Sequence, residues 1–184
     1  MAALKVGYYD LNAHQGVASE RAIVLADGYS PTNLTNFSDL SGLSALFIDN
    51  TKFNGYASGF AANLPAIGAY VAAGGSLVFH DASALAGLLP GVAVNDATSG
   101  FAYQLDFVND TGRVADGAGG TLDDTSLDGG GAFGNNTGYI DIDGVADQEF
   151  AFLMTRPLAG QGVTVLASSG SGYALYSTIP LGNY

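Results

Sequence analysis

Two short apolar runs constrain this chain most: residues 45–50, ALFIDN, and residues 76–81, SLVFHD. Neither run alternates apolar and polar residues, and continuous apolar character is typical of a strand buried on both faces of a parallel sheet. Between them, residues 59–75 carry apolar residues at helical spacing and end in Gly74 and Gly75. The chain is therefore predicted to form an α/β fold around a parallel sheet.

The rest of the first half repeats this alternation. Residues 4–9 predict another buried strand, and residues 16–29 predict a helix that ends at Gly28. Residues 83–91 predict a short apolar helix after the strand at 76–81. The order is that of an open parallel sheet wrapped by helices.

The second half has a different character. Residues 92–149 are rich in Gly and Asp, and within them residues 101–108 and 137–143 alternate as strands. Residues 163–168 and 173–178 predict a hairpin that returns to the main sheet. We expect one domain, residues 1–184, with a mostly parallel central sheet flanked by helices, a Gly/Asp-rich β insertion and a C-terminal hairpin.

Charge and composition exclude several function classes. With 17 acidic residues against five Lys and Arg, the net charge of −12 disfavours binding to nucleic acid or anionic lipid. No cysteine is present, which excludes a thiolate nucleophile, disulfides and Cys-type metal sites. The longest apolar run, residues 64–79, is broken by Pro65 and too short to insert into a membrane. The acidity is typical of a protein that works in the presence of divalent cations. The alternative is that the charge only keeps a secreted protein soluble.

Polar residues directly follow the predicted parallel strands. In an open α/β sheet the ligand crevice lies at the carboxyl ends of the strands, so these residues predict an acidic rim around a ligand site. The alternative is that they cap helices and close turns. The residues concerned are Asp10, Asn12, Asp49, Asn50, His80 and Asp81.

Residues 121–136, TLDDTSLDGGGAFGNN, hold the strongest candidate metal site. Ca²⁺ takes six to eight oxygen ligands on a backbone that bends tightly. Asp123, Asp124 and Asp128 offer carboxylates, Asn135 and Asn136 offer amide oxygens, and three glycines at 129–131 let the chain bend. The spacing is not that of an EF-hand. Residues 139–149 are a second candidate, with the alternative that their acids lie on the wet face of a strand.

An enzyme is the main alternative to a binding protein. The layout resembles class I glutamine-amidotransferase-like and trehalose-utilisation-type domains, in which a nucleophilic Cys occupies a strand-to-helix turn. Here that turn reads FHDAS, and Ser83 lacks a Gly-x-Ser-x-Gly context. His80 and Asp81 are adjacent on a strand end, so their side chains are expected to point apart. No phosphate-binding glycine motif is present.

A more specific resemblance spans nearly the whole chain. The segments VGYYDLNAHQGVA, LFIDN, GYASGFAANLPAIGAYVAAGGSLVFHD, GGTLDDTSLDGGGAFGNNTGY and GYALYSTIPLGNY occur in that order. Together they resemble the peptide-binding domain of bacterial RTX adhesins. The chain differs from that pattern at Ala82 and Thr137, where an Arg and a His are expected.

This resemblance implies a function and a set of residues. It implies a secreted, non-catalytic, monomeric domain of a longer adhesin at the bacterial cell surface, which binds Ca²⁺ and the peptide C-termini of surface proteins on other cells. Ca²⁺ would help to hold the terminal carboxylate, which an acidic protein otherwise repels. The metal ligands expected are Asp110, Asp123, Asp124 and Asp128. The ligand-binding residues expected are Asn12, Asp49, Asn50, His80, Asp81, Gly129, Gly130, Asn135, Asn136 and Thr137.

Two alternative functions are also compatible with the sequence. One is a hydrolase or lectin on the same flavodoxin-like or amidotransferase-like fold, and the other is a Ca²⁺-stabilised spacer that binds nothing. The aromatic residues Tyr56, Phe133 and Tyr139 would either form an apolar wall beside a ligand or belong to the core.

Overall fold

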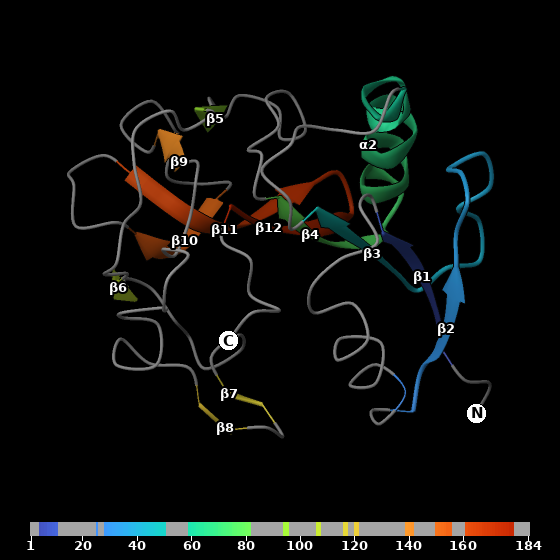
Figure 1. The fold of residues 1–184 in the computed structure, drawn as a ribbon, viewed down its shortest axis with the longest axis horizontal. Coiled ribbons are helices and arrows are strands. Elements are labelled where there is room, and N and C mark those ends of the chain that lie inside the picture. Colours follow the sequence, from blue (N-terminus) through green and yellow to red (C-terminus); the bar gives the residue numbers. More distant parts are fainter. Residues whose placement is uncertain are drawn as a thin grey trace.

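A mixed β-sheet organises the computed structural model of this chain (Figure 1). The structure describes residues 4–10, 25, 28–50, 59–81, 94–95, 106–107, 116–117, 120–121, 139–141, 150–155 and 161–178. Within these residues the main path of the sheet has the order β2-β1-β3-β4-β12-β11-β10-β6. Its first five strands are mutually parallel, and the remaining strands run antiparallel to their neighbours.

The strand bounds agree well with the apolar runs of the sequence. The parallel strands are β1 (Lys5–Asp10), β2 (Ser30–Asn33), β3 (Ala45–Asn50), β4 (Ser76–Asp81) and β12 (Gly172–Ser177). The antiparallel part contains β11 (Gln161–Ser169), β10 (Phe150–Thr155), β6 (Asp106–Phe107), β9 (Tyr139–Asp141) and β5 (Val94–Asn95). A separate pair is formed by β7 (Asp116–Gly117) and β8 (Gly120–Thr121). The predicted strands at 45–50 and 76–81 are confirmed, as is the return of the C-terminal hairpin to the sheet beside β4.

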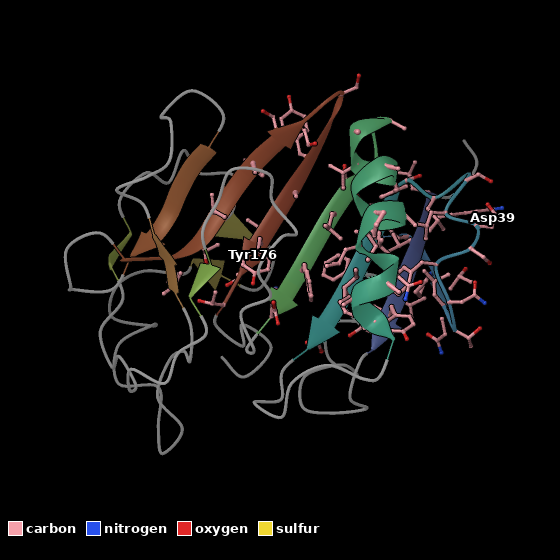
Figure 2. All side chains as sticks on the ribbon, turned by 90° about the horizontal axis from the view of Figure 1, so that it is seen from above. Asp39 and Tyr176 are labelled. Atoms are coloured by element: carbon pink, nitrogen blue, oxygen red, sulfur yellow. The ribbon has the colours of Figure 1, made fainter. Side chains whose placement is uncertain are left out.

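One helix covers a face of the parallel strands (Figure 2). A 3-10 turn, η1 (Phe60–Asn63), leads into α2 (Leu64–Ala72), with Pro65 in the first turn, where its missing N–H is not needed. Phe60, Ile67 and Val71 are buried against the sheet, as the helical spacing predicted. No described helix is long and apolar enough to cross a membrane.

Five of the described strands were not predicted from the sequence: β2, β5, β7, β8 and β10. β2 contains Pro31 between polar residues, and Pro is normally confined to sheet edges because it has no N–H to donate. In the structure β2 is the first strand of the sheet and pairs only with β1 among the described strands. β10, residues 150–155, was also missed.

Two predicted helices are described little or not at all. In the segment 16–29, Leu25 is helical, and Gly28 adopts a left-handed φ of 82° while donating its N–H to the carbonyl of Leu25 at 3.1 Å. That geometry is typical of a helix end. The segment 83–91 lies outside the described residues.

Aromatic packing fills the core between α2 and the sheet. Phe79 of β4 packs edge-on against Tyr176 of β12 at 5.6 Å and against Phe60 at 5.9 Å between ring centroids. Phe60 in turn meets Phe37 at 5.7 Å, and Phe37 meets Tyr9 of β1 at 4.4 Å. This continuous line of rings packs η1, which leads into α2, against the parallel strands.

Candidate functional site

A row of polar residues crosses the sheet near the carboxyl ends of the parallel strands. Asp10 of β1 pairs with Asp49 of β3, Asp49 with His80 of β4, and His80 with Ser177 of β12. Ser177 then pairs with Thr164 of β11. Residues in register on neighbouring strands lie on the same face, about 4.8 Å apart. We call Asp49, His80, Ser177 and Thr164 the polar row.

The polar row is buried. Asp49 is 1% exposed, His80 is 7% exposed, and Ser177 and Thr164 are fully buried. The hydroxyls of Ser177 and Thr164 are hydrogen-bonded at 2.8 Å. The ring of Phe47 meets the imidazole of His80 edge-on, with 6.5 Å between centroids. Burying four polar side chains side by side is unfavourable unless they are hydrogen-bonded. The row is therefore not ordinary core packing but a specific feature of the strand ends.

Asp81 lies on the opposite face of the sheet from His80. It pairs with Asn50 of β3, one position beyond the polar row. Tyr176, labelled in Figure 2, donates its phenol O–H to Oδ2 of Asp81 at 2.7 Å, and both residues are fully buried. The expectation that His80 and Asp81 point apart is therefore confirmed. Asp81 is fixed beneath the strand end by a side chain of β12.

The polar row contains the residue types of a hydrolytic triad, but a substrate cannot reach its serine. Asp49, His80 and Ser177 follow one another across three strands, as a carboxylate, an imidazole and a hydroxyl do in such enzymes. A nucleophile must reach its substrate, however, and Ser177 is 0% exposed and bonded to Thr164. This geometry suits a row that holds and orients His80 better than one that attacks a substrate.

Sequence reasoning placed some of this site and missed the rest. It singled out Asp49, His80 and Asp81, which the structure brings to the same edge on two neighbouring strands. It did not single out Ser177 or Tyr176. Residues 177–178, Ser-Thr, directly follow an apolar run just as the Asp of β3 does, but only the pairing of β12 with β4 brings them to this edge.

Most of the other predicted site residues lie outside the described part of the chain. Asn50 and Tyr139 are described as strand residues, in β3 and β9. Among the described residues no group of three or more His, Cys, Asp or Glu is arranged to hold a metal ion. The predicted residues outside the described ranges are Asn12, Tyr56, Ser83, Asp110, Asp123, Asp124, Asp128, Gly129, Gly130, Phe133, Asn135, Asn136 and Thr137.

Comparisons with known proteins place the fold. No protein-family model and no curated protein matches the chain. A glutamine amidotransferase from Thermotoga maritima superposes with a TM-score of 0.61 at 12% identity, over 99% of this chain and 77% of that chain. A ThuA-like protein from Bacteroides uniformis gives 0.59 at 13% identity, over 98% and 84%. The fold is that of the amidotransferase-like α/β proteins.

Similarity at this level of identity concerns the fold alone. A β-galactosidase from Rahnella sp. R3 matches 97% of this chain with a TM-score of 0.54 and 17% identity, but the match covers only 29% of the enzyme. The amidotransferase-like fold thus occurs both in small proteins and as one part of long enzymes. Fold similarity does not carry an activity from one chain to another.

The expected location of the protein is corrected by the same comparisons. A neighbour at 10% identity and a TM-score of 0.54, over 96% of this chain and 88% of that chain, is described as a cytoplasmic protein of Salmonella typhimurium. This contradicts the secreted, cell-surface location expected from the sequence, which is withdrawn. An acidic, cysteine-free composition keeps a protein soluble in any compartment, so it never specified one.

Proposed function

We propose that this chain is a non-catalytic module that binds the free C-terminal carboxylate of a peptide with the help of Ca²⁺. The observation that supports this function best is the polar row at the carboxyl ends of the parallel strands. It brings a buried carboxylate and imidazole to the edge where α/β sheets bind ligands, while its two hydroxyls, on Ser177 and Thr164, are inaccessible to a substrate. The ordered sequence resemblance to adhesin peptide-binding domains points the same way.

Charge explains why such a site needs a cation. Lys5, in the first residues of β1, is the one Lys or Arg among the described residues, and the whole chain carries a net charge of −12. Asp49 and Asp81 add two buried carboxylates at the strand ends. A peptide carboxylate approaching this edge is repelled unless a bound cation lies between the two negative groups. Ca²⁺ fits because residues 121–136 offer carboxylate, amide and carbonyl oxygens.

We assign a role to each of these residues from the chemistry of its side chain. Asp110, Asp123, Asp124 and Asp128 supply carboxylates to Ca²⁺. His80 is the member of the polar row with the greatest exposure and offers a ring N–H to the ligand. The glycines and amides at 129–136 complete the ligand contacts through backbone and side-chain groups. The peptide partner belongs to another protein, and nucleic acid is disfavoured by charge.

The test combines thermal unfolding with peptide binding. Unfolding is followed in EDTA and across a Ca²⁺ titration, with Mg²⁺ as the control ion. A Ca²⁺ concentration one hundred times the dissociation constant is expected to raise the free energy of unfolding by about 2.7 kcal/mol. Peptides with free carboxyl ends are then titrated in parallel with the same peptides amidated at the C-terminus.

Each result separates binding from the alternatives. Ca²⁺-specific stabilisation together with binding of the free-acid peptides alone supports the proposal. A flat response to Ca²⁺, or equal affinity for amidated peptides, contradicts it. Turnover of an ester, amide or glycoside that disappears in Ser83→Ala or His80→Ala would establish the hydrolase instead.

A further inference from the structure

The polar row extends from the parallel part of the sheet into its antiparallel part. Thr164 belongs to β11, in the antiparallel part of the sheet, and its hydroxyl lies 2.8 Å from that of Ser177. Ser177 is the register partner of His80, and His80 is the register partner of Asp49. Four buried polar side chains on one face of four adjacent strands therefore form an unbroken line from β11 to β3.

The chemistry of the polar row matches its order. A carboxylate only accepts hydrogen bonds, a neutral imidazole has one donating and one accepting nitrogen, and a hydroxyl donates one and accepts others. His80 lies between the carboxylate of Asp49 on β3 and the hydroxyl of Ser177 on β12. Phe47 packs against the imidazole with an interplanar angle of 85°, which limits rotation of the ring.

We propose that Ser177 and Thr164 are positioning residues that set the orientation and tautomer of the His80 imidazole. Thr164 donates to Ser177 and Ser177 donates to one ring nitrogen of His80, which leaves the proton on the other ring nitrogen. Bonds that all run in one direction polarise and strengthen one another. The consequence for peptide affinity rests on the proposed function, whereas the orientation of the ring does not.

Imidazole nitrogen NMR shifts of the full chain test the orientation directly. The chain has only two histidines, so His14→Gln assigns the His80 signals. At alkaline pH the two ring nitrogens of wild-type His80 are expected to show the well-separated shifts of a single tautomer. In Ser177→Ala they are expected to move toward the averaged shifts of an exchanging pair.

Two variants of Thr164 form a matched pair. In the polar row Ser177 lies between Thr164 and His80. Thr164→Val keeps the shape and removes the hydroxyl, whereas Thr164→Ser keeps the hydroxyl. Thr164→Val is expected to shift the His80 nitrogens and to weaken peptide affinity roughly five-fold, the effect of one neutral hydrogen bond. Thr164→Ser is expected to match wild type in both measurements.

The two readouts distinguish failure of this inference from failure of the proposed function. If the nitrogen shifts of His80 are unchanged in folded Ser177→Ala and Thr164→Val, the positioning role is wrong, even where stability falls. If those shifts respond while wild type binds no peptide, the positioning role stands and the proposed function fails. If wild type binds peptide and both variants leave shifts and affinity unchanged, the positioning role fails and the proposed function stands.

Discussion

At the scale of single residues, the hydrogen bond from Tyr176 to Asp81 joins the core to the candidate site. The ring of Tyr176 is part of the aromatic line under α2, while its O–H reaches Oδ2 of Asp81 at 2.7 Å. Both side chains are fully buried. A buried carboxylate needs its hydrogen-bond donors, so Tyr176 holds Asp81 in place by both packing and hydrogen bonding.

Removing that phenol is expected to destabilise the fold. Tyr176→Phe keeps the ring and deletes the donor to a buried carboxylate, which should lower the free energy of unfolding by about 1.5–3 kcal/mol. Urea denaturation measures the change. Tyr173→Phe is the control, because Tyr173 lies on the same strand and is 58% exposed, and its effect should stay within about 0.5 kcal/mol. Equal effects of the two changes would contradict this role of Tyr176.

Asp39 shows how an exposed acid can order a loop. In the segment that joins β2 to β3, Oδ1 of Asp39 accepts the backbone N–H of Ser41 at 2.9 Å and the Ser41 hydroxyl at 2.6 Å. Three residues earlier, Oδ1 of Asn36 makes the same two bonds to Ser38. Phe37, between the two acceptors, is turned into the core. The paired turns therefore anchor this loop on the sheet.

These bonds have a pH dependence with a defined sign. The Ser41 hydroxyl, followed by its backbone N–H, lowers the pKa of Asp39 below its ordinary value. Because the folded pKa is below the unfolded value of about 3.9, the contribution to stability is fully present above that pH. It is lost as the pH falls through the folded pKa. Ser41→Ala is expected to raise the pKa of Asp39, measured by carboxyl carbon NMR.

Ser38→Ala is the matched control for that titration. It removes the same hydroxyl bond from Asn36, which does not titrate. The pKa of Asp39 should be unchanged in this variant. A similar rise in both variants would mean that general loosening of the loop, and not the Ser41 hydroxyl, sets the pKa.

At the scale of elements, the β11–β12 hairpin caps the end of α2. The turn residue Ser171 donates its N–H to the carbonyl of Ala72 at 3.0 Å, and Tyr173 donates to Gly75 at 3.3 Å. The bond to Ala72 satisfies a carbonyl that the end of the helix leaves open. Gly170 adopts a left-handed φ of 59° in the turn, and Gly172 lies directly against the backbone of Val71 and Gly75. Close backbone contact thus joins the hairpin to the helix.

A side chain at position 172 is expected to break this contact. A Cβ there would overlap the carbonyl oxygens of Val71 and Gly75, which belong to backbone and cannot rotate away. Gly172→Ala should therefore lower the free energy of unfolding by about 1–3 kcal/mol. Gly68→Ala is the opposite control, since position 68 is in α2 with nothing within 4 Å of an added Cβ, and it should stabilise by about 0.5–1 kcal/mol. Thermal or urea unfolding of both variants measures the contrast, and equal signs would contradict it.

At the scale of the whole molecule, the sheet joins two unlike parts. The parallel strands β2, β1, β3, β4 and β12 carry α2 and the candidate site, while the antiparallel strands extend the sheet on the far side of β12 (Figure 1). β12 belongs to both parts, as the parallel neighbour of β4 and the antiparallel neighbour of β11. The Asp-rich segment lies between β4 and β10 in the sequence, and a cation bound only by the folded chain would raise its overall stability.

Asp128→Ala is the substitution that tests this stabilisation. If Asp128 is a Ca²⁺ ligand, the variant should have a lower Ca²⁺ affinity and a lower melting temperature in Ca²⁺, with nearly the same melting temperature in EDTA. Calorimetry in the two buffers measures both values. An equal loss in Ca²⁺ and in EDTA would mean that Asp128 orders its loop by hydrogen bonds and not through a metal ion.

The sequence by itself determined the elements whose signal is local. The apolar runs at 45–50 and 76–81 required buried strands, and the spacing of Phe60, Ile67 and Val71 required a helix with one apolar face. The polar residues at the strand ends followed from the same runs, because a polar side chain directly after a continuous apolar run marks the place where the strand leaves the core. This is why Asp49, His80 and Asp81 could be placed at one edge without coordinates.

Only the tertiary structure decided which residues meet across that edge. Ser177 lies 97 positions after His80 in the chain, and nothing in the local sequence states that β12 inserts beside β4 in parallel register. The same holds for Tyr176 and Asp81, and for β2, whose proline is tolerated because of its place at the sheet edge. Register between distant strands depends on how the whole apolar surface is buried, and that is a property of the folded chain alone.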